Sequence, residues 1–430
     1  MIIPKGYVRV RQLVDGGARV VFVSGNAGTG KTTLIQYLRE NVARHSVVLA
    51  PTGVAALNAG GATVHSFFRF PPRIQDPGAI HIPEDRRLYQ RLELLVIDEV
   101  SMLRADVLDN IDYFLRACND DPSPFGGVQM LLLGDMFQLP PVVPPAEWDV
   151  LADRGYESPY FFSASCLQGV DMEHIELDEI FRQSDPEFIS ILNRLRVGED
   201  IKAAMERLNG WCGEPEGDHD ITLTCTNRAA DTINGDALAG LPSEERVFVG
   251  DAEGSFSLSG DRLPSPQELH LKRGARVMFT KNDEEGRWVN GSLGVVSWLE
   301  GSRIEVDIDG AGIHEVPRAT WQSFKYRFDR KADRIVADEA GHYTQFPLML
   351  AWAVTIHKSQ GKTLGRVLVD FGSGAFAPGQ AYVALSRCRS LDGLRLARPL
   401  RASDVRTDAR IRRFHESLRS SDQADPFAGV

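Results

Sequence analysis

Two short groups of residues in the first quarter of the chain carry side chains suited to phosphate chemistry. Residues 25–32 read Gly-Asn-Ala-Gly-Thr-Gly-Lys-Thr and match G-x-x-x-x-G-K-[ST], a loop whose backbone N–H groups can surround a phosphate. In such a loop Lys31 reaches the outer phosphates and the Thr32 hydroxyl ligates Mg²⁺. The second group is Asp98-Glu99, in which an aspartate can support the metal ion and a glutamate can activate the attacking water. The two groups predict a nucleoside triphosphate site.

Each group follows an apolar run that reads as a buried strand. The run 18–23 precedes the loop, and the run 94–97 precedes the acidic pair. The segment 33–44 after the loop places Leu34, Leu38 and Val42 on one face of a helix. A strand, a glycine-rich turn and a helix N-terminus together form an anion-binding context. The alternative to a nucleotide-binding loop is a glycine-rich loop that matches the motif by chance.

Gln138 is a third candidate for the same site. It follows the buried run 128–133, in the stretch Gly-Asp-Met-Phe-Gln-Leu-Pro-Pro. A glutamine beyond a strand of the same sheet can touch a γ-phosphate and report its loss, whereas alone it would be a loop residue. Strands that alternate with helices up to this point predict a parallel, doubly wound sheet with ligands at the carboxyl ends of its strands.

Hydroxyl and aromatic residues follow the predicted strand 46–50. Thr52, His65 and Phe67 lie in this stretch, where hydroxyls can hold backbone phosphates and a ring can stack on a base of single-stranded nucleic acid. The alternative is that Phe67 and Phe68 belong to the core. The proline-rich segment 69–91 is predicted to be a small insertion.

The second half of the chain repeats the α/β pattern around a β-rich module. Phe-Arg-Gln at 181–183, Thr-Asn-Arg at 226–228, Thr-Ile-His-Lys-Ser-Gln-Gly at 355–361 and the arginine at 387 come from the α/β parts. Residues 245–340 contain short alternating stretches and an Asn-Gly turn at 290–291, which predict a small antiparallel module, a barrel. Basic and aromatic residues interleave at 318–331, where they could grip DNA or face the module's core.

Composition limits the class of protein. The 430 residues are too many for one ordinary core, and 43% hydrophobic with 25% charged residues is typical of a soluble globular protein. No apolar run is long enough to span a bilayer, and residues 1–10 lack the apolar core of a signal peptide. Five widely spaced cysteines without a C-x-x-C pair indicate reduced thiols and a cytoplasmic location. The net charge of −11 argues only weakly against nucleic-acid binding, because a local basic groove suffices.

The set of motifs resembles a superfamily 1 helicase motor and, more closely, the Pif-one (petite integration frequency) family of 5′-to-3′ DNA helicases. The most specific match runs from Asp98-Glu99 through Pro-Phe-Gly-Gly at 124–127 to Gly-Asp-Met-Phe-Gln-Leu-Pro-Pro-Val at 134–142. APTGVAALNAGG, HSFF, FRQ, IHKSQG and YVALSR are also similar to family motifs. The resemblance covers roughly residues 18 to 395.

The resemblance implies a role for each matching position. The nucleotide, ATP, would be held by Gly25, Ala27, Gly28, Thr29, Gly30, Lys31, Thr32, Thr33 and Gly361. Catalysis would use Glu99, Lys31, Gln138, Arg182 and Arg387, with Mg²⁺ at Thr32 and Asp98. The DNA track would be lined by Thr52, His65, Phe67, Asn227, Thr355, His357 and Lys358. One departure is at the N-terminus, where the family has a glutamine further upstream of the loop than Gln12. Adenine recognition is therefore left open.

The resemblance also implies an architecture and partners. Two RecA-like parallel-sheet motor domains would hold ATP between them, the first at 1–165 with a wedge-like insertion at 69–91. The second would comprise 166–244 and 341–415, interrupted by a Src-homology-3-like barrel at 245–340, and 416–430 would be a polar tail. Single-stranded DNA and DNA forks would be the partners of a monomeric motor, with no membrane. The resemblance would also place the protein in a family that acts in DNA repair, DNA recombination and telomere maintenance.

Two alternatives remain from the sequence. The RecD-like and Dda-like 5′-to-3′ helicases share the motor and the β module, and the Pro-Phe-Gly-Gly stretch distinguishes them. A protein that binds ATP as a switch without translocating would lack Arg182, Arg387 and the motif at 355–361, all of which are present.

Overall fold

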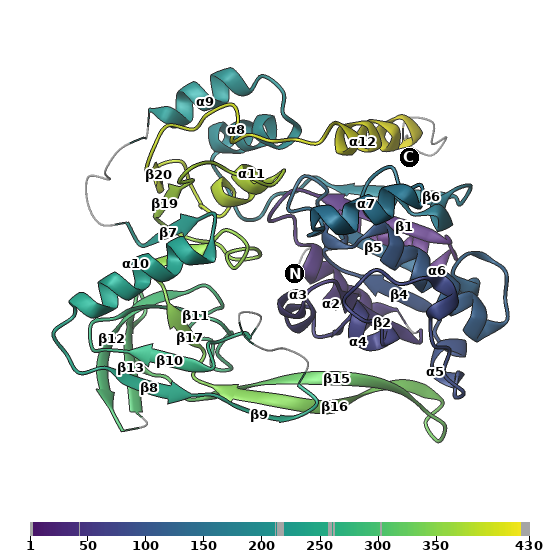
Figure 1. The fold of residues 1–430 in the computed structure, drawn as a ribbon, viewed down its shortest axis with the longest axis horizontal. Helices are drawn as coiled ribbons and strands as arrows, with labels where there is room; N and C mark the ends of the chain where they lie inside the picture. Colours follow the sequence, from purple (N-terminus) through teal and green to yellow (C-terminus); the bar gives the residue numbers. More distant parts are fainter. Residues whose placement is uncertain are drawn as a thin grey trace. The chain divides into compact units, whose positions relative to one another are not determined.

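The computed structural model describes residues 3–42, 44–210, 212, 219–256, 260, 263–301 and 303–422, with the side chains described up to residue 418. The chain forms two compact units (Figure 1). The first comprises residues 1–181, 323–340 and 408–430, and the second comprises 182–322 and 341–407. Each unit therefore takes segments that are far apart in the sequence.

The first unit is built on a six-stranded sheet in the order β3-β2-β4-β5-β1-β6, and the strands pair in parallel. The strands are β1 (Val20–Gly25), β2 (Ser46–Ala50), β3 (Ala62–Thr63), β4 (Leu94–Ile97), β5 (Gln129–Gly134) and β6 (Met172–Leu177). Four of them, β1, β4, β5 and most of β2, are buried along their length because both faces of the sheet are covered. This confirms the predicted parallel sheet.

Helices cover both faces of the sheet, and alternate residues of β1 point to opposite faces. Val21 and Val23 pack in a core with α1 (Lys5–Asp15) and α2 (Lys31–Asn41), whereas Phe22 points to the other face and contacts Phe161 and Phe414. The remaining helices of this unit are α3 (Gly53–Asn58), α4 (Val64–Phe68), α5 (Arg87–Gln90), α6 (Ala105–Asn119), α7 (Pro145–Asp153) and α12 (Ala409–Asp422). Its short 3-10 turns are η1 (Pro77–Ala79), η2 (Val100–Met102), η3 (Pro124–Gly127), η4 (Phe161–Ser163) and η5 (Ser165–Leu167).

The second unit has a smaller parallel sheet in the order β18-β7-β19-β20. Its strands are β7 (Ile221–Thr224), β18 (Ala353–Thr355), β19 (Val367–Asp370) and β20 (Leu394–Leu396), and its helices are α8 (Pro186–Val197), α9 (Ile201–Asn209), α10 (Asn227–Gly240) and α11 (Gln380–Leu385). Helix α10 packs on β7 and β18. This sheet confirms the second predicted α/β part.

The β module lies between these α/β segments in the sequence. Hydrogen bonds group its strands into a pair β10-β8, a five-stranded sheet β14-β13-β12-β11-β17 and a three-stranded sheet β15-β16-β9. The strands are β8 (Arg246–Val249), β9 (Asp251–Gly254), β10 (Glu268–Leu271), β11 (Arg276–Phe279), β12 (Leu293–Glu300), β13 (Arg303–Ile308), β14 (Gly312–Glu315), β15 (Ala319–Asp329), β16 (Arg334–Gln345) and β17 (Leu348–Leu350). One apolar core joins residues of β8, β10, β11, β12, β13 and β17. A closed barrel stays a prediction.

The predicted boundaries differ from the observed ones at three places. Strand β6 pairs with β1, so the first unit continues past residue 165 to 181. The boundary predicted at 340 falls inside β16, and β17 extends the β module to residue 350 by pairing with β11. Helix α12 continues through residue 422, so the expected polar tail from 416 begins as a helix. Both β6 and α12 carry many polar residues on their exposed sides, which concealed them in the sequence.

Candidate nucleotide site and nucleic-acid interface

The phosphate loop lies between the carboxyl end of β1 and the first residue of α2. Gly28 and Gly30 have positive φ angles of 86° and 83°, a conformation that glycine adopts readily. Lys31 Nζ donates hydrogen bonds to the carbonyl oxygens of Gly25 (2.9 Å) and Asn26 (3.0 Å). The predicted loop residues are therefore together, and the ammonium group lies over the loop that it is expected to serve.

Two aromatic residues that the sequence did not single out contact this loop. The Tyr7 hydroxyl donates a hydrogen bond to the Gly30 carbonyl oxygen at 2.7 Å, and a Cβ atom at Gly30 would lie 2.5 Å from that hydroxyl. The Phe181 N–H donates to the Gly28 carbonyl oxygen at 2.9 Å, and the Phe181 side chain is 58% exposed. Phe181 could have been found from its place beside Arg182, whereas Tyr7 has no motif around it. Gln12 lies on the same helix as Tyr7.

The acidic pair lies where β4 ends. Asp98 is 5% exposed and accepts a hydrogen bond from the Glu99 N–H at 2.9 Å, while Glu99 has a φ of 51°. Burial, with the nearby Glu99 charge, raises the pKa of Asp98 to about 7, and Lys31 opposes this shift. A buried carboxylate of this kind gains from a cation, and a carboxylate with the exposed Thr32 hydroxyl is an oxygen donor set that fits Mg²⁺.

Gln138 lies in a turn after β5 that Asp135 organises. The Gln138 N–H donates to the Asp135 carbonyl oxygen at 3.0 Å, and Gln138 Nε2 donates to Asp135 Oδ2 at 3.3 Å. The Phe137 N–H donates to Asp135 Oδ1 at 3.2 Å. Because β1, β4 and β5 belong to one parallel sheet, the loop, the acidic pair and Gln138 share its carboxyl edge. The first unit thus gathers these predicted nucleotide residues.

Residues of the second unit form a separate group. Arg182 Nε donates to Thr363 Oγ1 at 3.0 Å, and Arg182 Nη2 donates to the Gly361 carbonyl oxygen at 3.2 Å. This contact brings together two predicted positions of distant motifs. Arg387 is 1% exposed, and its guanidinium donates to the Val383 carbonyl oxygen (2.9 Å) and to Ser386 Oγ (3.1 Å). Arg387 is thus held against α11.

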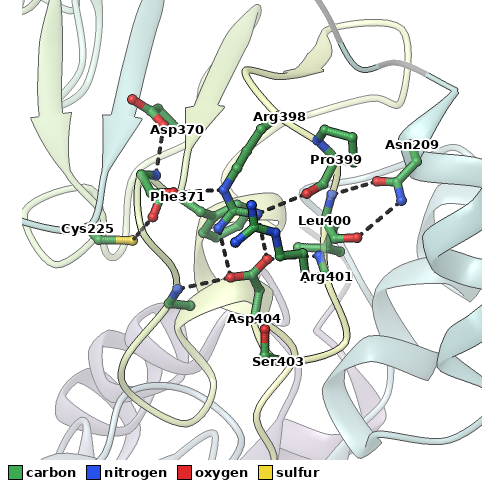
Figure 2. Close-up of polar contacts among 12 residues, drawn as sticks. Asn209, Cys225, Asp370, Phe371, Arg398, Pro399, Leu400, Arg401, Ser403 and Asp404 are labelled. Atoms are coloured by element: carbon green, nitrogen blue, oxygen red, sulfur yellow. Dashed lines mark hydrogen bonds and ion pairs between the residues drawn. The ribbon is translucent and has the colours of Figure 1, made fainter.

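Polar contacts brace the turn that leads from β19 to α11 (Figure 2). Arg398 donates to both Asp404 oxygens at 2.8 and 2.9 Å, and to the Gly372 carbonyl oxygen at 2.8 Å. Asp404 is 1% exposed; burial alone would raise its pKa, but the hydrogen bonds from Arg398 and from backbone N–H groups lower the pKa below its usual value. Sequence reasoning missed this pair, which fixes the approach to α11, the helix that ends just before Arg387.

The predicted DNA residues of the second unit lie at the carboxyl ends of its strands. Asn227 follows β7 as the first residue of α10 and is exposed, and Thr226 Oγ1 caps this helix by accepting from the Ala229 N–H at 3.3 Å. Thr355 ends β18, and its Oγ1 accepts from the Lys358 N–H at 3.3 Å. The Lys358 side chain is exposed, and burial lowers the pKa of His357.

The predicted DNA residues of the first unit differ in exposure. Thr52 caps α3 by accepting from the Ala55 N–H at 3.3 Å, and His65 lies on α4 and is half-buried. Phe67 is only 7% exposed, and its ring contacts the rings of Phe68, Tyr89 and Tyr326. Phe67 is therefore packed in the core of this unit, as the core alternative predicted.

The basic and aromatic stretch 318–331 contacts protein in several places. Trp321 is 6% exposed, and the Arg318 guanidinium lies 5.3 Å from the centre of the Phe346 ring. Phe328 contacts Arg91 at 5.2 Å, and Tyr326 contacts Phe67. These contacts favour the packing interpretation for much of this stretch.

The chain matches a family model described as PIF1-like helicase over residues 8–203. It is 34% identical over 388 residues to the ATP-dependent DNA helicase Pif1 of Bdellovibrio bacteriovorus, covering 87% of this chain and 83% of the relative. It is 35% identical over 411 residues to the ATP-dependent DNA helicase PIF1 of Rattus norvegicus, covering 93% of this chain and 62% of that relative. The chain thus spans about three fifths of the rat protein.

A solved structure of Bacteroides sp. Pif1 in complex with ADP-AlF4 is also similar, with 36% sequence identity, a TM-score of 0.89 and 98% of each chain covered. The structure of Bacteroides Pif1 bound to single-stranded DNA has a TM-score of 0.71 at 36% identity and the same coverage. Within the described ranges, no helix combines the length and apolarity of a membrane span. The same ranges contain no group of three His, Cys, Asp or Glu side chains that could hold a metal ion.

Proposed function

The chain belongs to the PIF1-like helicase family, and from this premise we propose that it is an ATP-dependent DNA helicase that moves 5′ to 3′ on single-stranded DNA and unwinds duplex or structured DNA. The observation that carries the proposal is that each of the two parallel-sheet units has its own set of residues suited to phosphate chemistry. One unit has the phosphate loop with Asp98, Glu99 and Gln138, and the other has Arg182 in contact with Gly361.

In the proposed reaction the first unit binds and positions the nucleotide. Backbone N–H groups of the loop and Lys31 hold the phosphates, and Thr32 and Asp98 hold Mg²⁺, which neutralises phosphate charge when bound. Glu99 orients the attacking water and accepts its proton, and Gln138 contacts the γ-phosphate. Asp98 would hold the cation as a carboxylate, because a nearby positive charge favours the ionised form and opposes the effect of burial on its pKa.

We propose that Arg182 and Arg387 supply positive charge to the γ-phosphate in the transition state. An arginine suits this role because its planar guanidinium always carries charge and can form two hydrogen bonds to phosphate oxygens. Arg182 is already oriented by Gly361 and Thr363, whereas Arg387 has to leave its contacts with Val383 and Ser386. ATP would thereby favour one conformation, and hydrolysis would release it.

The DNA side of the proposal rests on Thr52, His65, Asn227, Thr355, His357 and Lys358. Hydroxyl, amide and ammonium groups suit contacts with the phosphate backbone, which predicts weak base preference and strong salt dependence. The solved structure of Bacteroides Pif1 bound to single-stranded DNA supports the proposal that this chain binds single-stranded DNA. Phe67 would join the track only if the Tyr326 ring moved away from it.

Partners and location belong to the same proposal. We propose single-stranded DNA and forks as ligands and a monomer as the smallest active motor, although one similar solved structure describes two coordinating Pif1 helicases at forked double-stranded DNA. A cytoplasmic location fits the five free cysteines. The RecD-like and Dda-like alternatives are less favoured because the family match includes the Pro-Phe-Gly-Gly element.

The proposal is tested by measuring ATP hydrolysis with and without single-stranded DNA, together with unwinding of partial duplexes that carry a 5′ or a 3′ tail. We expect DNA to stimulate hydrolysis and only the 5′-tailed duplex to open. If DNA does not change the rate of ATP hydrolysis and neither duplex opens, the result would favour the alternative of an ATP-binding switch that does not translocate. Opening of the 3′-tailed duplex alone would refute the proposed polarity.

A further inference from the structure

The last helix, α12, is part of the core of the first unit. Its inward residues Ile411, His415 and Leu418 are 2%, 7% and 5% exposed, at the spacing of one helical face. Phe414 stacks on Phe162 with a centroid distance of 4.3 Å and an interplanar angle of 15°, and also contacts Phe22. Figure 1 draws α12 beside β6, the strand next to β1.

Polar contacts fix the start of this helix. Asp408 accepts a hydrogen bond from the Tyr160 hydroxyl at 3.2 Å and from the Arg410 backbone N–H at 2.9 Å. The Arg410 guanidinium binds Asp408 at 2.7 Å and donates to the Glu157 carbonyl oxygen at 3.0 Å. The helix is therefore held at its first turn and along its apolar face, which limits its freedom to slide.

One residue of α12 reaches the turn that carries Gln138. The His415 ring lies edge-on to the Phe137 ring, with 5.2 Å between centroids, and His415 Nε2 is 3.6 Å from Glu176 Oε1 on β6. Phe137 is 3% exposed and directly precedes Gln138. Asp135 holds the same turn from within through hydrogen bonds to the Phe137 and Gln138 N–H groups and to Gln138 Nε2.

We infer that His415 is a positioning residue for Gln138. Asp135 fixes the backbone of the turn, and the His415 ring fixes the Phe137 side chain, so that Gln138 Nε2 keeps one place at the carboxyl edge of the sheet. The inference rests on the proposed function, in which Gln138 contacts the γ-phosphate. A small displacement of such a contact reduces turnover strongly, because catalysis depends on groups held in place before the reaction.

The first test compares His415→Ala with the control Ser417→Ala in the full chain. Ser417 is exposed on the same helix, and its hydroxyl donates a hydrogen bond to the Phe414 carbonyl oxygen. His415→Ala should lower kcat of ATP hydrolysis about 3- to 10-fold while the Kd for ADP stays within 2-fold. The preference for a non-hydrolysable ATP analogue over ADP should shrink, because that preference reports γ-phosphate contact. Ser417→Ala should leave all three unchanged.

The second test is a double-mutant cycle with Gln138→Ala. If His415 acts through Gln138, His415→Ala should have little further effect on kcat in the Gln138→Ala background. An equal loss in both backgrounds would overturn the inference, as would an unchanged kcat in His415→Ala. Normal turnover of Gln138→Ala alone would instead refute the proposed role of Gln138, so the two failures are distinguishable.

Two further variants separate positioning from folding. His415→Phe keeps an aromatic edge against Phe137 and should restore kcat to within about 2-fold of the natural chain. His415→Gln replaces His415→Ala in every comparison if thermal unfolding shows that the alanine variant is not folded. A His415→Phe chain that is folded yet as slow as His415→Gln would contradict the role of the ring.

Discussion

Arg182 Nη2 lies 3.2 Å from the carbonyl oxygen of Gly361, although 179 positions separate the two residues in the chain. The same guanidinium donates to Thr363 Oγ1 at 3.0 Å. These two hydrogen bonds hold the Arg182 guanidinium in one orientation. A group that contacts a transition state has to be oriented in this way before the reaction. The contact thus joins the Phe-Arg-Gln motif to the loop after β18.

Replacing Arg182 by alanine should therefore abolish most turnover. We expect kcat of DNA-stimulated ATP hydrolysis to fall by roughly 10³-fold, the range for arginines that act on a transferring phosphoryl group, while ATP affinity changes little. Steady-state kinetics with a fluorescent nucleotide titration would measure both. Arg194→Ala, which removes an arginine from a surface ion pair with Asp200, is the control and should be neutral. Near-normal hydrolysis in Arg182→Ala would remove its catalytic assignment.

Glu99→Gln should separate nucleotide binding from hydrolysis. The amide keeps the size of the side chain but cannot accept the proton of the attacking water, so ATP and single-stranded DNA should bind while kcat falls by at least about 10²-fold. Glu93→Gln is a matched control, because Glu93 precedes the same strand at its opposite end and accepts a hydrogen bond from the His45 N–H. Unwinding at the natural rate by Glu99→Gln would show that another group is the base.

Tyr7→Phe should weaken nucleotide binding without unfolding the chain. The Gly30 carbonyl oxygen accepts hydrogen bonds from the Tyr7 hydroxyl and from the Leu34 N–H, so the hydroxyl ties α1 to the loop that precedes α2. Loss of one such bond is worth roughly 1 kcal/mol, so the Kd for ADP should rise about 3- to 10-fold. Calorimetric titration with ADP would measure this rise in Kd. Tyr37→Phe is the control, because the Tyr37 ring lies next to the Tyr7 ring. This variant should leave the Kd for ADP unchanged.

Gly126→Ala should destabilise the first unit more than Gly155→Ala. Both glycines have positive φ, 58° and 89°, so alanine is strained at either position by about 1–2 kcal/mol. A Cβ at Gly126 would also lie 2.4 Å from the Leu115 carbonyl oxygen, whereas nothing lies within 4 Å of a Cβ at Gly155. Denaturant unfolding of both variants therefore isolates the steric part. Equal losses of stability would mean that the Pro-Phe-Gly-Gly turn relaxes easily.

Stability should depend on the ionisation of Lys362. Its ammonium group donates to Asn290 Oδ1, and burial lowers the pKa of Lys362 to about 8 from an ordinary value of 10.5. Between these two pH values the unfolded chain binds a proton that the folded chain does not, so this residue makes stability rise with pH across that window. Below about pH 8 Lys362 is protonated in both the folded and the unfolded chain, so the free-energy cost of burying its ammonium group does not change with pH.

The free energy of unfolding of the natural chain minus that of Lys362→Met should accordingly increase from pH 8 to pH 10.5. Denaturant titrations at several pH values would measure this difference. Lys358→Met removes an exposed ammonium group from the same turn and serves as the control. A difference that is flat with pH would show that Lys362 is not held in the lowered-pKa environment.

The sequence by itself determined the local chemistry. The phosphate loop, the acidic pair after β4 and the glutamine after β5 were recognisable because each depends on residues close in the chain, and the apolar runs that precede them predicted the buried parallel strands. The family resemblance followed from the same short motifs and their order. Alternating polar residues concealed β6 and α12, because one face of each is exposed.

Only the tertiary structure decided which distant residues act on those motifs. The sequence carries no signal that Tyr7 contacts Gly30, that Arg182 contacts Gly361 or that His415 contacts Phe137, because the two residues of each pair lie far apart in the chain. Burial likewise decided that Phe67 packs among aromatic rings and that Asp98 has a raised pKa. These properties depend on what surrounds a side chain in space, and sequence spacing does not specify it.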